Sequence, residues 1–140
     1  MGAGIAQVAA QAKHRVLLLD SRAGAAAQAK QKLQGTLDSL VSKQKITAQA
    51  ALDTVAAITP IDSVDQLGDQ AANVDLAIEA IVEDLTAKRS VFREIEALLR
   101  PDCILATNTS SISVTAIANG LKHPSRLLGK HFFNPVPLMK

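Results

Sequence analysis

"MGAGIAQVAAQAKHRVLLLD", residues 1–20, contains a glycine pair, a helical pattern, an apolar run and an acidic residue. Apolar residues recur at helical spacing over residues 3–13, which predicts a helix with Gly2 and Gly4 at its N-terminus. Residues 15–20 form a continuous apolar run, which is typical of a parallel strand buried on both faces. A glycine turn, a helix and a strand that ends in an acid form the second half of a dinucleotide-binding βαβ unit.

The rest of the chain alternates predicted strands with predicted helices. Residues 23–43 are rich in Ala, Gln and Lys and predict a long helix, and residues 47–55 predict a second one, so the two should form a helical hairpin arm. Further strands are expected at 55–61, 74–81, 103–110 and 126–133, and further helices at 84–100 and 114–121. This alternation predicts an α/β fold with a Rossmann-type doubly wound parallel sheet, which lacks its first strand.

Local signals define the ends and faces of these elements. Pro60 is expected to stop its strand, and Pro101 prevents the preceding helix from continuing. Ser113 is suited to cap the helix that follows it. On the helix at 84–100, the apolar stripe is expected to consist of Leu85, Val91, Ile95 and Leu98.

Composition excludes several classes of protein. At 140 residues, with 48% hydrophobic and 20% charged residues, the chain suits one globular domain. Its 15 basic residues are scattered, so no nucleic-acid partner is expected. No apolar run approaches the roughly 20 residues that span a bilayer, and no basic segment of a signal peptide is present, so we expect no membrane partner and a cytoplasmic location. Cys103 lies in an apolar run and is expected to be buried rather than reactive.

An acidic residue follows the glycine turn at a spacing that suits cofactor binding. Asp20 comes 18 residues after Gly2, near the roughly 20 residues expected between the turn and the acid that binds the adenine ribose. An acid at this position favours NAD over its phosphorylated relative. A strand-ending Asp can equally cap the following helix, and the nearby Arg22 leaves the choice of cofactor open.

Polar residues gather where the later strands are predicted to end. "TNTSS" at 107–111 and "HFFNPVP" at 131–137 both follow predicted strands, where open α/β sheets bind ligands. Glu83 and Asp84 precede a helix, where they either serve this site or interact with the helix dipole. His131 can be a packed core residue or, beside this polar turn, a general base near neutral pH. Neither a Cys/His metal motif nor a nucleophile elbow occurs.

Taken together, these stretches resemble the 3-hydroxyacyl-CoA dehydrogenases, especially the bacterial 3-hydroxybutyryl-CoA and 3-hydroxyadipyl-CoA enzymes. The resemblance covers essentially all 140 residues, and its most specific motifs are "ATNTSSISVTAIA" and "HFFNPVPLMK". It implies an NAD-binding Rossmann domain over 1–140, without the helical C-terminal domain that supplies much of the dimer interface in these proteins. It also implies oxidation of (S)-3-hydroxyacyl-CoA to 3-ketoacyl-CoA with NAD, in fatty-acid or aromatic-acid catabolism.

The resemblance assigns a role to individual residues of this chain. Gly2 would be the last glycine of the G-x-G-x-x-G turn, and Asp20 would bind the adenine ribose. Ser110 would hydrogen-bond the 3-oxygen of the substrate, and His131 would take its hydroxyl proton. The residues expected around the nicotinamide end of NAD are Glu83, Lys88, Asn108 and Asn134, and those expected to contact CoA on the helical arm are Thr36 and Lys43.

The chain also departs from the family pattern. Lys13 stands where relatives usually have a helix-terminating glycine, and a non-glycine residue in the left-handed conformation costs about 1 kcal/mol. The first strand and first two glycines are missing, and the acid that orients His131 would lie just beyond Lys140. We therefore expect a domain truncated at both ends and inactive in isolation. The alternative interpretation is a non-catalytic dinucleotide-binding or assembly module.

Overall fold

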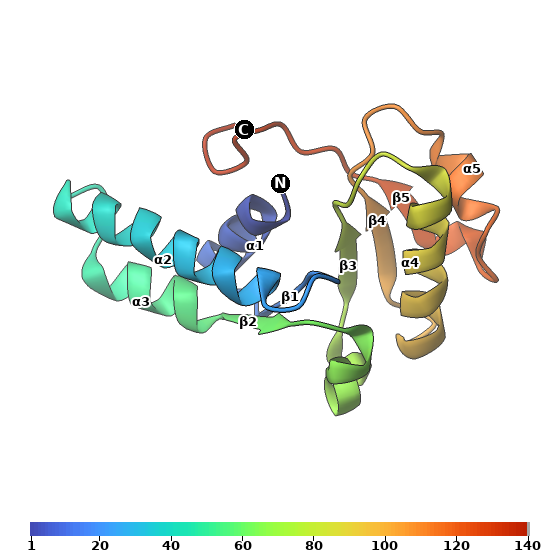
Figure 1. Cartoon of the computed structure of the whole chain (residues 1–140), viewed down its shortest axis with the longest axis horizontal. Coiled ribbons are helices and arrows are strands. Elements are labelled where there is room, and N and C mark those ends of the chain that lie inside the picture. Colours follow the sequence, from blue (N-terminus) through green and yellow to red (C-terminus); the bar gives the residue numbers. More distant parts are fainter. Residues whose placement is uncertain (140) are drawn as a thin grey trace. The chain divides into compact units, whose positions relative to one another are not determined.

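The structure is a computed structural model that describes residues 1–139 (Figure 1). The chain divides into two compact units. Unit 1 comprises Met1–Gln66 together with the C-terminal segment that begins at Phe133, and unit 2 comprises Leu67–Phe132. Each unit has its own parallel sheet with helices packed against it, which confirms the predicted parallel α/β class.

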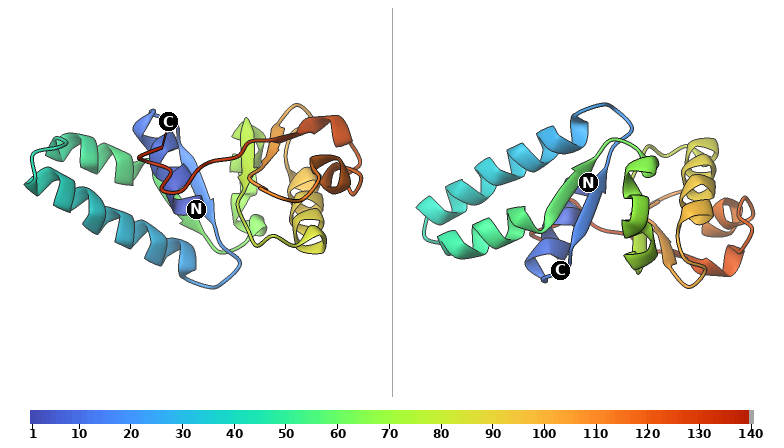
Figure 2. Two further views of the ribbon diagram at one scale, coloured as in Figure 1. Left: turned by 90° about the horizontal axis from the view of Figure 1, so that it is seen from above. Right: turned by 90° about the horizontal axis from the view of Figure 1, so that it is seen from below.

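Unit 1 contains a two-stranded sheet and three helices. Its elements are α1 (Gly2–Gln11), β1 (Val16–Leu19), α2 (Ala25–Ser42), α3 (Ala48–Ala56) and β2 (Ile58–Ile61). β1 and β2 pair in parallel, with Val16 opposite Ile58. Figure 2 shows α2 and α3 lying side by side as the predicted hairpin arm. A core formed by Ala6, Ala10, Leu33, Leu37, Ala51 and Ile58 joins the arm to α1 and the sheet.

Helices α1 and α2 are each followed by a tight turn that contains a non-glycine residue in the left-handed conformation. Lys13 has φ 71° and Gln44 has φ 57°, which is the left-handed region that favours glycine. After α1, the amide of Lys13 donates to Ala10 and that of His14 to Ala9, the hydrogen-bond pattern of a Schellman turn. The expectation for Lys13 is therefore confirmed, and Gln44 is a second such position.

The second strand of unit 1 continues past its proline. Pro60 itself pairs with Leu18, and the strand ends one residue later at Ile61, which is the end predicted for it. Because β1 is the only strand partner of β2 in the described part of the chain, a residue without an amide N–H is tolerated there.

Unit 2 contains a three-stranded parallel sheet in the order β3-β4-β5. Its elements are β3 (Leu76–Glu79), α4 (Leu85–Leu98), β4 (Ile104–Thr107), α5 (Val114–Ala118), the 3-10 turn η2 (Pro124–Arg126) and β5 (Leu127–Gly129), preceded by η1 (Val64–Asn73). Glu79, Thr107 and Gly129 lie in register at the carboxyl ends of the strands. Ser113 caps α5 as predicted, because its hydroxyl accepts a hydrogen bond from the Ala116 amide.

Helix α4 buries a face that matches the predicted one only in part. Its buried residues are Lys88, Phe92 and Glu96, whereas Leu98, a member of the predicted stripe, is 45% exposed. The other members of the predicted stripe are half-buried, namely Leu85, Val91 and Ile95. The stripe therefore overlaps the buried face but omits its charged members, which the prediction treated as surface residues. Lys88 and Glu96 are buried with their charges satisfied, by carboxylates in one case and by backbone amides in the other.

Candidate active site

The candidate site begins with two side chains at the carboxyl ends of neighbouring strands. Glu79 and Thr107 are register partners on β3 and β4, so their side chains point to the same face of the sheet. Both residues are buried, and the Thr107 hydroxyl donates to Glu79 Oε2 at 2.7 Å. Glu79 Oε1 accepts from the Ile81 amide at 2.6 Å. The Glu79 carboxylate is therefore fixed at the sheet edge.

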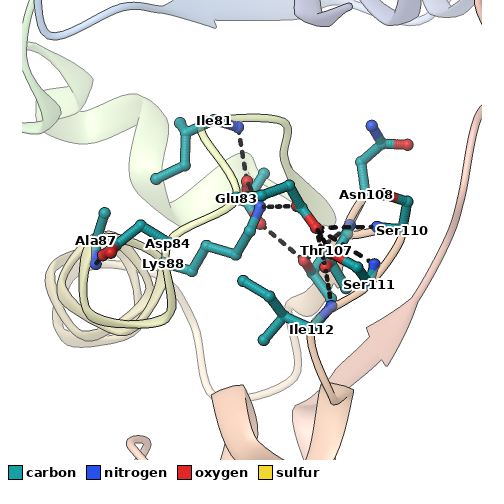
Figure 3. Close-up of polar contacts among 12 residues, drawn as sticks. Ile81, Glu83, Asp84, Ala87, Lys88, Thr107, Asn108, Ser110, Ser111 and Ile112 are labelled. Carbon is teal, nitrogen blue, oxygen red and sulfur yellow. Dashed lines mark hydrogen bonds and ion pairs between the residues drawn. The ribbon is translucent and has the colours of Figure 1, made fainter.

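A buried lysine joins this carboxylate to a second one (Figure 3). Lys88 Nζ lies 2.7 Å from Glu79 Oε1 and 3.0 Å from Glu83 Oε1, and the lysine side chain is 1% exposed. Lys88 lies in the first turn of α4, which Asp84 caps by accepting from the Ala87 amide. A cation at a helix N-terminus opposes the helix dipole, so the two carboxylates are what make its burial favourable.

Glu83 in turn holds the polar loop that follows β4. Its Oε2 accepts from the hydroxyls of Thr109 and Ser111, both at 2.8 Å, and from the amides of Ser110 and Ser111, both at 3.3 Å. The Ser111 hydroxyl, the Lys88 ammonium and the Thr109 hydroxyl together lower the pKa of Glu83 to about 2. Glu83 is therefore ionised at neutral pH and fixes the backbone on both sides of the Ser110 side chain.

The predicted base lies beyond the end of β5, against the same loop. His131 Nδ1 is 3.2 Å from the Asn108 carbonyl oxygen, and the Phe132 amide donates to Asn108 Oδ1 at 2.7 Å. Because a carbonyl oxygen can only accept, this contact places a proton on Nδ1, and in the neutral imidazole Nε2 then carries the lone pair. His131 is exposed, so the alternative of a packed core histidine is wrong.

The predicted ribose ligand lies in unit 1, at the end of β1. Asp20 Oδ1 accepts from the amide of Arg22 at 2.9 Å, and the Arg22 guanidinium lies 3.3 Å from both carboxylate oxygens. These hydrogen bonds lower the pKa of Asp20 below its usual value. Asp20 does not cap the next helix, whose N-cap is Gly24 without a side-chain bond.

A cleft of about 370 Å³ adjoins Asp20 within unit 1. It is lined by Ala3, Gly4, Gln7, Asp20, Arg22, Ala25, Gln28, Ala29, Lys32 and Leu33. The N-terminal end of α1 and an ionised carboxylate at a strand end thus border one hollow, which is the donor and acceptor set that the adenosine and phosphate parts of a dinucleotide need. The residues present fit NAD.

The ten predicted site residues divide between the two units. Unit 2 brings together Glu83, Lys88, Asn108, Ser110 and His131 at the carboxyl ends of its strands, whereas Gly2, Asp20, Thr36, Lys43 and Asn134 belong to unit 1. Gly2 opens α1, Thr36 donates to the Lys32 carbonyl on α2, Lys43 is the C-cap of α2, and Asn134 is exposed in the C-terminal segment.

Sequence reasoning missed Glu79, Thr107 and Thr109. The signal for Glu79 was present, since a single acidic residue interrupts the apolar strand "LAIEAI" at 76–81. A charge inside a parallel strand is buried and requires a partner of opposite charge. Lys88 supplies it nine residues later.

Comparison with known proteins identifies close relatives over the whole chain. A family model described as "3-hydroxyacyl-CoA dehydrogenase, NAD binding domain" matches residues 1–140. The 3-hydroxyadipyl-CoA dehydrogenase of Escherichia coli (strain K12) is 44% identical over 140 residues, which is all of this chain and 29% of that protein. The 3-hydroxybutyryl-CoA dehydrogenase of Clostridioides difficile is 40% identical over all of this chain and 48% of that protein.

Solved structures agree with these matches. The crystal structure of 3-hydroxybutyryl-CoA dehydrogenase from Escherichia coli K12 superimposes with a TM-score of 0.93 at 44% identity, covering 100% of this chain and 29% of that one. The (S)-3-hydroxybutyryl-CoA dehydrogenase from Ralstonia eutropha gives a TM-score of 0.90 at 34% identity, over 99% of this chain and 48% of that one. The chain thus spans less than half the length of each of these relatives. Across residues 1–139, the structure contains no helix with the length and hydrophobicity to cross a bilayer.

Proposed function

This chain belongs to the 3-hydroxyacyl-CoA dehydrogenase family, as its NAD-binding domain, and we propose that it supplies the cofactor-binding part of an enzyme that oxidises (S)-3-hydroxyacyl-CoA to 3-ketoacyl-CoA. The observation that carries the proposal is the arrangement at the carboxyl ends of β3, β4 and β5. There Glu83 fixes the loop that bears Ser110, and Asn108 of the same loop contacts His131.

Several residues of this chain would hold NAD. Asp20 would bind the hydroxyls of the adenine ribose beside the N-terminal end of α1, where Gly2 leaves the backbone uncovered. Glu83, Lys88, Asn108 and Asn134 would surround the nicotinamide end. NAD, when bound, supplies the hydride acceptor of the reaction.

The protein's own residues would manage the proton and the substrate oxygen. His131 Nε2 carries the lone pair and would take the proton of the substrate 3-hydroxyl. Ser110 would hydrogen-bond the same oxygen and keep it in place as its carbon becomes a carbonyl. The substrate alcohol would lose its hydroxyl proton to His131, and bound NAD would supply the acceptor for the hydride, so that the two-electron oxidation balances.

The remaining proposals concern the rest of the enzyme. Thr36 and Lys43 are both exposed on the helical arm, where they would contact CoA, and the Lys43 ammonium suits its phosphates. A helical C-terminal domain would complete the substrate pocket and form a homodimer. We place the enzyme in the cytoplasm and in fatty-acid or aromatic-acid catabolism.

A chimera tests the proposed reaction. The chain would replace the matching segment of the Escherichia coli 3-hydroxyadipyl-CoA dehydrogenase, and reduction of NAD by 3-hydroxyacyl-CoA would be followed. We expect activity in the chimera, and a loss of about 10²- to 10⁴-fold in kcat for His131→Gln, because the general base is removed. His123→Gln is the matched control, since His123 lies before η2 and away from the loop.

Two results would contradict this proposal. One is a folded chimera that binds NAD but does not oxidise any 3-hydroxyacyl-CoA. The other is equal activity in the His131→Gln and His123→Gln chimeras. The isolated 140-residue chain is expected to be inactive, and NAD reduction by the chain alone, above that of its own His131→Gln variant, would refute this last point.

A further inference from the structure

Glu79 is a buried carboxylate for which the proposed reaction has no direct use. Its side chain is 0% exposed, and each of its oxygens already has a donor from within unit 2: Lys88 and the Ile81 amide for Oε1, Thr107 for Oε2. A carboxylate buried among these donors is not accessible to a ligand. What it can do is hold Lys88 in one position.

Lys88 transmits that constraint to the surface. Glu83 is 39% exposed at its side chain and on its own would be a mobile surface carboxylate. Because the Lys88 ammonium bridges Glu79 and Glu83, the exposed carboxylate is tied to the buried one. The charged groups that face the ammonium are these two carboxylates. Neither β4 nor α5 presents a charged side chain among its residues.

The chain of contacts ends at the loop that carries Ser110. Glu83 Oε2 receives the Ser110 and Ser111 amides and two hydroxyls of the loop, whereas Glu83 Oε1 is the oxygen that faces Lys88. One carboxylate thus uses one oxygen for the lysine and the other for the loop, so a displacement of Lys88 displaces the loop.

We propose that Glu79 is a positioning residue, which acts through Lys88 and Glu83 to hold the loop 109–111 and thereby the Ser110 hydroxyl in the arrangement that binds the substrate oxygen. This inference rests on the function proposed above, because it assumes that Ser110 contacts the substrate. The network itself consists only of residues of unit 2.

The test measures the loop and Glu83 directly, by NMR on the 140-residue chain. In Glu79→Ala, we expect amide exchange at Ser110 and Ser111 to accelerate by about tenfold or more, the effect of weakening a hydrogen bond to a charged acceptor. We also expect the pKa of Glu83 to rise from about 2 toward its ordinary value of 4.5, because its lysine partner is no longer anchored.

Glu96→Ala is the matched control. Glu96 is a second buried carboxylate of unit 2, on the same helix as Lys88, and it accepts from the amides of Lys122 and His123 at 2.9 and 2.8 Å. Its loss should leave Ser110, Ser111 and Glu83 unchanged. Equal exchange at the two serines in both variants would overturn the proposal. So would a lower pKa of Glu83 in Glu79→Ala, since removal of a nearby negative charge acting only through space lowers it.

A second pair of variants decides the question if Glu79→Ala does not fold. Glu79→Asp keeps the charge but shortens the side chain, so it withdraws from Lys88, and exchange at Ser110 and Ser111 should rise. Glu79→Gln keeps the length but replaces one acceptor oxygen with an NH2 donor and removes the charge that pairs with Lys88, so exchange at the two serines should rise there as well. Unchanged exchange in Glu79→Asp would refute positioning by Glu79. Because these measurements use neither cofactor nor substrate, a negative result leaves the proposed reaction standing, and failure of the chimera leaves the network standing.

Discussion

Among individual side chains, the sequence indicated those at the surface of the site better than those beneath it. Ser110, Ser111 and His131 follow strands in a polar context, and the structure brings all three to the carboxyl ends of β4 and β5. Glu79 and Thr107 lie inside the strands themselves, where a pattern of apolar residues conceals a buried polar pair. The acid within "LAIEAI" does signal that Glu79 requires a partner, but its pairing with Thr107 depends on the register between two strands that are far apart in the sequence.

The left-handed conformation of Lys13 predicts that a substitution by glycine will stabilise the fold. Replacing Lys13 with glycine should stabilise unit 1 by about 1 kcal/mol, because glycine adopts its φ of 71° without a steric penalty. The melting temperature should rise by about 4–8 °C for a unit of this size. Lys13→Ala is the control, since it also removes the ammonium that lies 3.9 Å from Asp53 but retains the Cβ atom. A gain as large in Lys13→Ala would show that the backbone conformation is not the cause.

The lowered pKa of Glu83 predicts a loss of folding stability in acid. Its pKa is lowered to about 2 in the folded chain and is near 4.5 when unfolded, so its contribution to stability is present above pH 4.5 and is lost as the pH falls toward 2. Thermal unfolding followed from pH 6 to pH 2 should therefore show a steeper acid loss in the original chain than in Glu83→Gln. Glu94→Gln, which removes an exposed carboxylate of α4, should behave as the original chain does. Identical acid profiles for all three proteins would contradict the depressed pKa.

For the helices and strands, the sequence predicted where each element lies better than it predicted which side of a helix is buried. The arm, α4 and the cap at Ser113 were confirmed because long helical patterns, prolines and capping residues are local signals. The buried face of α4 was predicted only in part, because a buried lysine and a buried glutamate count as polar in any pattern, and only their partners on other elements explain them. Pro60 likewise remains in β2 because of its place at a sheet edge.

The face of α4 can be tested by a pair of truncations. Phe92 is 0% exposed, and Phe92→Ala should destabilise unit 2 by about 3–5 kcal/mol through lost burial and a cavity. Leu98→Ala removes a residue that is 45% exposed, and should cost less than about 1 kcal/mol. Urea unfolding measures both changes. A larger loss for Leu98→Ala would restore the stripe predicted from the apolar pattern.

For the chain as a whole, the parallel α/β class followed from the alternation of strands and helices, but its division into two sheets did not. In the described part of the chain, β1 has only β2 as a strand partner and β3 has only β4, so each keeps one edge without backbone hydrogen bonds. A sequence pattern identifies strands and does not determine which of them pair. An apolar strand followed by a G-x-G turn, added before Gly2, supplies a partner of the kind that the doubly wound order places there.

The most direct measurement is a fluorescence titration of NADH into the chain with that N-terminal extension, beside the unextended chain. The extended chain is expected to bind NADH more tightly than the unextended one. In the extended chain, Asp20→Asn should weaken binding by about tenfold, since it removes the charge that we propose binds the ribose hydroxyls. Asp38→Asn should not, because Asp38 bonds only Gln34 on the exposed face of α2. Failure of the extended chain to bind NADH, or equal affinities for the two variants, would contradict the assignment of this chain as an NAD-binding domain with Asp20 as its ribose ligand.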